Sequence, residues 1–237
     1  MARHGFSVLA VIPARGGSKG IPRKNLCKVA GLSLVEHAAI IAKGLTWIDS
    51  CVLSTDDPEI AAEGRRCGLD VPFLRPAELA SDKATGVAAW QHAWLESEAA
   101  FERRFDCSVL LQPTTPLRTV EDVTSTIDAM LLGGHRAATT ISRVPGHFTP
   151  EKLMLLKEGQ VSFLHPDGAR HSNRQSIPAY YTRNGLCYAA MREAVVDRME
   201  IVETDCAGVI TVGHVANIDE PIDLAFAEFL AMRGRAE

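Results

Sequence analysis

Short apolar runs alternate with amphipathic stretches along most of this chain. The runs at 8–12, 51–54, 107–111, 137–142, 186–191 and 208–212 are too short for helices and predict buried strands. Between them, residues 33–43, 59–67 and 85–103, and stretches beginning near 120 and 221, predict helices. This alternation is typical of a parallel α/β sheet covered by helices.

Capping signals mark several of the predicted helix ends. Ser33 and Glu36 form a capping-box pattern, and Asp57 followed by Pro58 is a strong helix start. Gly44 and Gly68 are placed to end these two helices.

Two of the predicted helices carry apolar faces that we expect to be buried. In the helix at 85–103 these residues are Val87, Trp90, Trp94 and Leu95. In the last helix, which we expect to pack on the sheet, they are Ile222, Ala225, Phe226, Phe229 and Leu230. Helical spacing of tryptophans favours a core role over a cofactor platform.

The β–α rhythm breaks down at residues 144–185. Prolines, polar residues and a predicted hairpin (154–156 and 161–163, around Gly159) replace it. The segment is too short to bury a core of its own. We therefore predict one domain, 1–237, with an insertion at about 144–185 whose apolar residues need a partner surface.

The first predicted strand runs into a loop rich in glycine and in cations. The glycines are Gly16, Gly17 and Gly20, and the cations are Arg15, Lys19, Arg23 and Lys24. Glycine allows a positive φ and a close approach to a ligand, and no acid precedes Glu36. Backbone N–H groups and cations after a strand favour polyphosphate binding over a merely solvated basic turn. The stretch matches neither the Walker A pattern nor G-x-G-x-x-G.

Composition limits the functional classes. The chain has 237 residues, a net charge of −4 and 46% hydrophobic residues, so its basic loop is local and non-specific nucleic-acid binding is not expected. Six cysteines form no C-x-x-C pair, which favours a reducing cytoplasm. We expect neither a signal peptide nor a membrane span.

Further polar loops follow other predicted strands. Asp56 lies after the second strand and could contact a metal or a ribose, or could only order its turn. Arg75 lies on a stiff, proline-flanked segment suited to clamping a phosphate or a base. The loop at 112–118 is locked by two prolines and projects an amide, two hydroxyls and a guanidinium. It could bind a polyhydroxylated ligand or be a rigid connector that leads to a helix capped by Thr119. A purely structural role is an alternative for Arg118.

Four ordered segments resemble the acylneuraminate cytidylyltransferases, the CMP-sialic acid synthetases. The segments read I-P-A-R-G-G-S-K-G-I-P-R-K-N (12–25), R-P-A-E-L-A-S-D (75–82), Q-P-T-T-P-L-R (112–118) and R-Q-S-I-P-A-Y-Y-T-R-N-G (174–185). The resemblance implies a Rossmann-like, mostly parallel sheet with helices on both faces. It implies a homodimer in which the insertion reaches the second subunit, and transfer of a cytidylyl group from CTP to a 2-keto-3-deoxy sugar acid with release of pyrophosphate.

The resemblance also implies roles for individual residues. The catalytic residues would be Arg15, Lys19 and Lys24. The nucleotide would be bound by Ala14, Arg15, Gly16, Gly17, Ser18, Lys24, Asn25, Arg75 and Asp82. The sugar acid would be bound by Gln112, Thr114, Thr115, Arg174, Gln175, Tyr181 and Asn184. Asn184-Gly185 is also the strongest short hairpin signal, so a tight turn is an alternative or additional interpretation.

The predicted Mg²⁺ site departs from the family pattern. Where the synthetases usually have D-x-D, this chain has Asn217-Ile-Asp219. Asp219 is the predicted metal ligand, Asn217 offers only a neutral oxygen or is a turn residue, and Asp223 is expected in the first turn of a helix.

The exact substrate stays open at this stage. Sialic acid and bacterial relatives such as legionaminic or pseudaminic acid fit the loop, and the eight-carbon acid Kdo is an alternative. Because of Asn217, a catalytically silent nucleotide-sugar sensor is a second alternative. The choice of CTP rests on the resemblance alone.

Overall fold

The computed structural model describes residues 3–166, 168, 177–202 and 205–233. It divides the chain into two compact units, one of residues 1–140 with 184–237 and one of residues 141–183. Among the described helices, none is both long and apolar enough to cross a bilayer.

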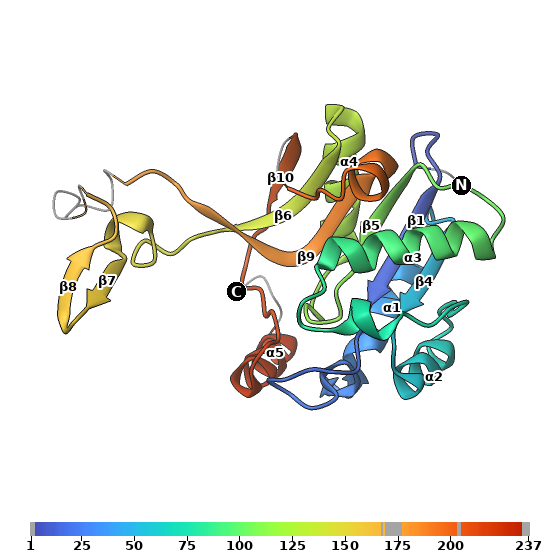
Figure 1. Cartoon of the computed structure of the whole chain (residues 1–237), viewed down its shortest axis with the longest axis horizontal. Coiled ribbons are helices and arrows are strands. Elements are labelled where there is room, and N and C mark those ends of the chain that lie inside the picture. Colours follow the sequence, from blue (N-terminus) through green and yellow to red (C-terminus); the bar gives the residue numbers. More distant parts are fainter. Residues whose placement is uncertain (1–2, 167, 169–176, 203–204, 234–237) are drawn as a thin grey trace. The chain divides into compact units, whose positions relative to one another are not determined.

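A six-stranded sheet forms the centre of the first unit, with strand order β10-β6-β9-β5-β1-β4 (Figure 1). Its strands are β1 (Val8–Pro13), β4 (Ser50–Ser54), β5 (Cys107–Leu110), β6 (Ala137–Arg143), β9 (Tyr181–Met191) and β10 (Cys206–Ile210). The last residues of β6 (141–143) and the first of β9 (181–183) are counted with the second unit. β1 pairs in parallel with β4 and β5, whereas β9 runs antiparallel to β5. The predicted fold class, a mostly parallel α/β sheet with helices on both faces, is confirmed.

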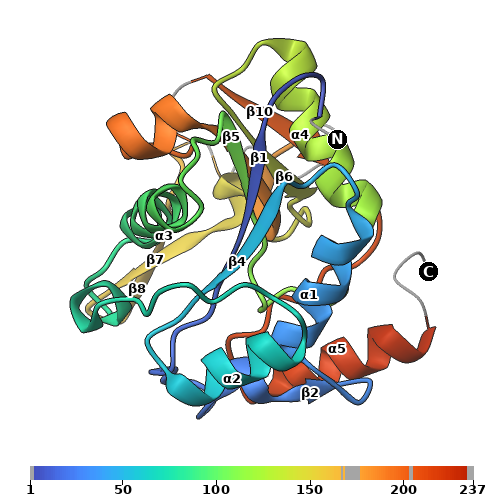
Figure 2. The ribbon, with the colours of Figure 1, turned by 90° about the vertical axis from the view of Figure 1, so that its right-hand side faces the viewer.

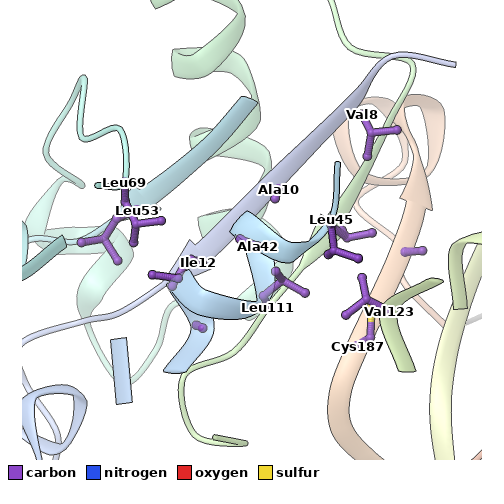
Figure 3. Packing of buried hydrophobic residues seen from close by; sticks show 14 of the residues in the cluster. Val8, Ala10, Ile12, Ala42, Leu45, Leu53, Leu69, Leu111, Val123 and Cys187 are labelled. Carbon is purple, nitrogen blue, oxygen red and sulfur yellow. The ribbon is translucent and has the colours of Figure 1, made fainter. Parts of the chain in front are cut away.

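Alternate residues of β1 point into two separate cores. Val8, Ala10 and Ile12 pack on one face against α1 (Leu34–Gly44) and α4 (Val120–Gly133). Leu9 and Val11 pack on the other face against α3 (Gly86–Ala100). Figure 2 shows α3 on one side of the sheet and α1 on the other, and Figure 3 shows the packing of the first core. Because every residue from Val8 to Ile12 is fully buried, the strand reads as a continuous apolar run.

The predicted capping residues begin their helices. The Ser33 hydroxyl accepts a hydrogen bond from the Glu36 N–H (3.1 Å) at the start of α1. The Asp57 carboxylate accepts from the N–H of Glu59 (2.8 Å) at the start of α2 (Pro58–Arg66). Thr119 and Asp122 form a reciprocal capping box on α4. These contacts set the direction in which each helix leaves the sheet.

The two predicted apolar helix faces have different outcomes. Trp90 and Trp94 are fully buried as expected, but Leu95 is 41% exposed. In α5 (Pro221–Arg233) the buried residues are Ala227 and Leu230, whereas Ile222 is 69% exposed. The expectation that this helix packs on the central sheet is wrong. It packs beside the small hairpin of β2 (Lys28–Val29) and β3 (Leu32–Ser33), in a core with Val29, Leu34 and Ile218.

The second unit contains a hairpin of β7 (Met154–Lys157) and β8 (Gln160–Phe163), paired antiparallel. Every residue of both strands is exposed within this chain. Tyr180 donates a hydrogen bond to the buried Glu151 in the same unit (2.5 Å). An isolated two-stranded hairpin is marginally stable in water, so its apolar side chains need a covering surface.

Candidate active site

The glycine-rich loop leaves the carboxyl end of β1 and is held at three points. The Ala14 N–H donates to the Ser54 carbonyl at the end of β4 (2.9 Å). The Gly16 N–H donates to the Asp56 carboxylate (2.9 Å), and the buried side-chain amide of Asn25 donates to the carbonyl of Arg15 (2.9 Å). Of the two alternatives for Asp56, the structure therefore supports ordering of the loop.

Two glycines of this loop are required by close packing. A Cβ on Gly16 would lie 2.8 Å from the side chain of Asp57, and a Cβ on Gly20 would lie 2.3 Å from the carbonyl oxygen of Asp219. A Cβ on Gly17 would meet nothing within 4 Å. None of the three has a positive φ, so the expectation of left-handed glycines is wrong here; Arg23 is the loop residue in that conformation (φ 54°).

A pocket of about 500 Å³ opens beside this loop, at the carboxyl ends of β1 and β5. Ligands of open α/β sheets bind at this edge. The predicted site residues that line it are Arg15, Ser18, Lys19, Lys24, Asn25, Arg75, Asp82, Gln112, Thr114 and Asp219. The lining also includes several small or apolar residues that were not predicted as site residues: Leu79, Ser81, Ala84, Gly86, Ala89 and Leu110. Ala84, Gly86 and Ala89 belong to a stretch of mostly small residues around the start of α3, which is the one sequence signal for them.

Each cation of the loop that lines the pocket has an acidic or carbonyl partner. The Asp82 carboxylate contacts Arg15 Nη1 (3.1 Å) through one oxygen and Lys19 Nζ (2.5 Å) through the other. Lys24 Nζ donates to the carbonyl of Ile218 (2.7 Å) and to the Asp219 carboxylate (2.9 Å). The hydrogen bond from Lys19 and the charges of Lys19 and Arg15 lower the pKa of Asp82, so this carboxyl is ionised.

Arg75 lines the same pocket and is only 6% exposed. Its Nε and Nη2 donate to the hydroxyl (3.0 Å) and carbonyl (2.6 Å) of Ser54, and its backbone N–H donates to Thr55 (2.8 Å). Burial lowers the pKa of Arg75, but an arginine stays charged at neutral pH. A fixed, desolvated cation is suited to an anionic ligand.

The loop at 112–118 is divided between the pocket and the core. Gln112 and Thr114 line the pocket, whereas Thr115 is fully buried and its hydroxyl donates to the Gly185 carbonyl (3.0 Å). Arg118 is also buried and donates to the carbonyl of Gln112 (2.6 Å) and the hydroxyl of Thr115 (2.7 Å). The structure therefore gives Arg118 and Thr115 the role of bracing the loop.

The buried side chain of Asn184 links neighbouring segments of the sheet by hydrogen bonds. Its Oδ1 accepts from the hydroxyl of Thr140 (2.6 Å), and its Nδ2 donates to that of Thr211 (2.7 Å). Asn184 and Gly185 lie within β9 and form no hairpin turn; Gly185 has a φ of 77°. A Cβ there would stand 3.1 Å from the side-chain oxygen of Gln112, so Gly185 leaves room for this pocket residue.

The remaining predicted sugar-acid ligands lie outside the described pocket lining. Arg174 and Gln175 fall outside the described residues. Tyr181 belongs to the second unit and is 43% exposed. Their substrate contacts stay predictions.

The residues around Asp219 fit a Mg²⁺ site that the substrate's phosphates complete, but not one built from protein ligands alone. Asp219 is exposed and lines the pocket; Asn217 is exposed but is not among the lining residues. Asp223 is a helix-start residue, as expected, since its carboxylate accepts from the N–H of Asp219 (2.9 Å) and of Glu220 (2.8 Å). Mg²⁺ is commonly bound by one or two carboxylates together with substrate phosphates. Asp219 can provide the carboxylate, and the neighbouring cationic loop can hold the phosphates.

One other group of metal-ligating side chains occurs among the described residues, formed by Glu36, Glu63 and Cys67. Arg66 contacts Glu63 and Glu36 within it (both 2.8 Å), and none of these residues lines the pocket. The ion pair occupies this cluster, so it does not compete with Asp219 as a candidate.

This fold and this pocket define an α/β protein whose ligand site lies at the carboxyl edge of a mostly parallel sheet and carries several cations. Its relatives specify the class further. The chain belongs to the cytidylyltransferase family, whose model matches residues 9–200. The predicted family resemblance is thereby confirmed, and the chain is a nucleotidyltransferase.

Two curated relatives cover nearly the whole chain. The chain is 30% identical to the post-translational flagellin modification protein B of Campylobacter coli, over 94% of each chain. It is 28% identical to the CMP-N,N'-diacetyllegionaminic acid synthase of Legionella pneumophila, over 94% of this chain and 95% of that one. Among solved structures, a CMP:2-keto-3-deoxy-manno-octonic acid synthetase complexed with CTP superposes with a TM-score of 0.69 at 17% identity, covering 96% of this chain and 99% of that one. At that identity the likeness supports the fold alone.

Proposed function

We propose that this enzyme joins CTP to a nine-carbon 2-keto-3-deoxy sugar acid, such as legionaminic, pseudaminic or sialic acid, and releases pyrophosphate. The observation that carries the proposal is the pocket itself: three cations on a glycine loop, a buried arginine and an exposed carboxylate line one cavity of about 500 Å³. The nine-carbon class follows from the legionaminic acid synthase that matches 94% of this chain.

The reaction is a displacement at the α-phosphorus of CTP. The anomeric hydroxyl oxygen of the sugar acid forms the new P–O bond, and the bond to the β-phosphate breaks. Arg15, Lys19 and Lys24 bind the triphosphate and stabilise the negative charge that grows on the departing pyrophosphate. Positioning supplies much of the remaining rate enhancement, since it converts an encounter of two solutes into a reaction within one complex.

Other pocket residues orient the two substrates. The Ser18 hydroxyl and those loop N–H groups that have no acceptor within the described part of the protein bind phosphate oxygens, and Arg75 holds the nucleotide from the side of β4. Gln112 and Thr114 offer an amide and a hydroxyl to the hydroxyl groups of the sugar acid. We expect charge neutralisation and orientation by these residues to supply the chemistry.

Mg²⁺ would be held by Asp219 together with phosphate oxygens of the nucleotide, with the Asn217 carbonyl oxygen as a neutral neighbour. When bound, such an ion neutralises phosphate charge and lowers the pKa of a nearby hydroxyl. Lys24 now contacts Asp219, so phosphate binding at Lys24 would free this carboxylate.

We also infer a homodimer in a reducing, cytoplasmic compartment. The exposed apolar residues of the β7–β8 hairpin support the dimer: Leu156 is 74% exposed and Val161 65%. All six cysteines are free thiols, which suits a reducing compartment.

The test is pyrophosphate release across a panel of the four nucleoside triphosphates and several 2-keto acids, with and without Mg²⁺. We expect Mg²⁺-dependent release with CTP and a nine-carbon acid. Preferred turnover of Kdo would change the substrate class. Binding of CTP without release from any acid would indicate a nucleotide-sugar sensor and contradict the proposal.

A further inference from the structure

One carboxylate stands between two cations of the proposed phosphate site. Asp82 uses its two oxygens separately, one on Arg15 Nη1 (3.1 Å) and one on Lys19 Nζ (2.5 Å). All three side chains line the pocket. A phosphate group would make the same two contacts with two of its oxygens, because a carboxylate and a phosphate face offer anionic acceptors at similar spacing.

The segment that carries Asp82 is fixed at both ends. At one end, the buried side chain of Arg75 is bonded to Ser54. At the other end, Thr85 caps α3 by accepting from the N–H of Ala88 (3.2 Å). Between these anchors, the segment contacts the glycine loop through the Asp82 ion pairs and through a hydrogen bond that Arg15 Nη1 donates to the Ala80 carbonyl (3.3 Å).

The internal bonds of the segment are local. The Ser81 hydroxyl donates to the carbonyl of Glu78 (2.8 Å), and the Ala84 N–H donates to the carbonyl of Ser81 (3.2 Å). The Asp82 side chain is 45% exposed, and that of Lys19 is 81% exposed. Contacts made through exposed side chains can be exchanged for a ligand without disturbing the buried anchors.

We propose that Asp82 is an internal competitor for the triphosphate: it occupies Arg15 and Lys19 in the free enzyme, is displaced by phosphate, and returns as pyrophosphate leaves. The inference rests on the proposed function in one respect, that Arg15 and Lys19 bind phosphate. It assigns Asp82 a role opposite to that of a direct nucleotide ligand. Competition weakens nucleotide binding, but it also shortens the time that the product stays bound.

The neutral, isosteric variant Asp82→Asn separates the two roles. Glu78→Gln is the matched control, since it removes the same charge from an exposed residue four positions away that does not line the pocket. Inorganic tripolyphosphate and CTP are the probes, and titration calorimetry in low-salt buffer measures their dissociation constants. Tripolyphosphate reports on the cations independently of any base.

We expect Asp82→Asn to bind both probes about 3- to 30-fold more tightly than the wild type, because the ligand no longer displaces two exposed ion pairs. We also expect stronger inhibition by pyrophosphate. Glu78→Gln should bind within about twofold of the wild type. Thermal melts establish that both variants are folded.

The outcomes separate the inference from the proposed function. Binding by Asp82→Asn that is equal to or weaker than that of the wild type would overturn the inference and make Asp82 a direct ligand. The expected tightening without pyrophosphate release from any substrate pair would overturn the proposed function and leave the inference standing. If neither the wild type nor Asp82→Asn bound tripolyphosphate or CTP, both the inference and the proposed function would be overturned.

Discussion

Lys24 contacts two acceptors from one distant segment, the carbonyl of Ile218 and the carboxylate of Asp219. Its side chain is only 13% exposed, so it is held more tightly than Lys19, at 81%. The Ile218 carbonyl keeps the Lys24 ammonium in place when phosphate replaces the Asp219 carboxylate, so Lys24 stabilises a developing charge with little reorganisation. Lys24 is therefore better positioned than Lys19 to stabilise the charge that develops in the reaction.

Lys24→Ala and Arg15→Ala should each lower the rate of pyrophosphate release by about a hundredfold or more. The protein should stay folded, because both positions face the pocket. A coupled assay with CTP and the preferred acid measures the loss. Lys28→Ala, an exposed cation on β2, is the control. Near-wild-type turnover in either pocket variant would contradict the assignment.

The ionised carboxylate of Glu63 should make the free energy of unfolding depend on pH in the acidic range. Hydrogen bonds from Arg66 and Ser33 lower the pKa of Glu63 to about 2. A carboxyl with a lowered folded pKa contributes stability above its unfolded pKa of about 4.5, and this contribution is lost as the pH falls towards 2. Because Arg66 is 56% exposed, solvent screening limits the contribution to about 1–2 kcal/mol.

Glu63→Gln should therefore lower the free energy of unfolding by about 1–2 kcal/mol at pH 7. The difference from the wild type should shrink steadily between pH 5 and pH 2. Urea unfolding at several pH values measures it, and Glu96→Gln, an exposed acid on α3, is the control. A deficit that did not vary with pH would show that packing, not charge, accounts for the effect.

The backbone of the glycine loop packs closely against the segment that carries Asp219. A Cβ on Gly20 would stand 2.3 Å from a backbone oxygen of Asp219, whereas one on Gly17 would meet nothing. Contact with backbone is costly, since neither side can rotate away as a side chain can.

Gly20→Ala should lower the free energy of unfolding by about 1–3 kcal/mol and weaken CTP binding at least about tenfold. Gly17→Ala, in the same loop, should stay within about 1 kcal/mol of the wild type in unfolding. Chemical denaturation and CTP titration compare the two. Equal destabilisation by both substitutions would mean that chain flexibility, not the contact with Asp219, is what the loop requires.

The sequence predicts elements well where the signal is local. The continuous apolar run of β1 and the caps Asp57 and Thr119 need only their neighbours, and these elements form where expected. The antiparallel direction of β9 and the burial of Thr115 depend on contacts about 70 to 85 residues away in the chain, which periodicity does not encode. The face of α5 was assigned wrongly for the same reason, since its partner Val29 lies almost 200 positions earlier.

The pocket was predictable to the extent that it follows strand ends. Arg15 and Gln112 follow buried strands closely, and Lys24 lies in the loop that leaves β1. The carboxyl ends of parallel strands meet at one edge. The pairing of Asp82 with Arg15 and Lys19 was not predictable, because it depends on how an irregular segment returns to the sheet.

For the whole molecule, the hairpin of the second unit has the clearest consequence. Met154, Leu156 and Val161 are all more than half exposed within one chain. A second copy that covers them would remove this apolar surface from water at about 25 cal/mol per Å².

The wild type should sediment as a dimer at micromolar concentration, and Leu156→Glu with Val161→Glu should shift it towards monomer. Lys157→Ala, a polar change on the same hairpin, should leave the dimer intact. Analytical ultracentrifugation over a range of concentrations distinguishes these cases. A wild type that stayed monomeric throughout would contradict the proposed assembly.

The contact between Gly20 and the Asp219 carbonyl has a consequence for inhibitor design. A small molecule that wedges between the glycine loop and the backbone of Asp219 would separate the two segments, so one insertion would disturb both the phosphate cradle and the neighbouring acidic ligand. Such a compound would not need to imitate cytidine or the sugar, and resistance by substitution at Gly20 would damage the enzyme itself.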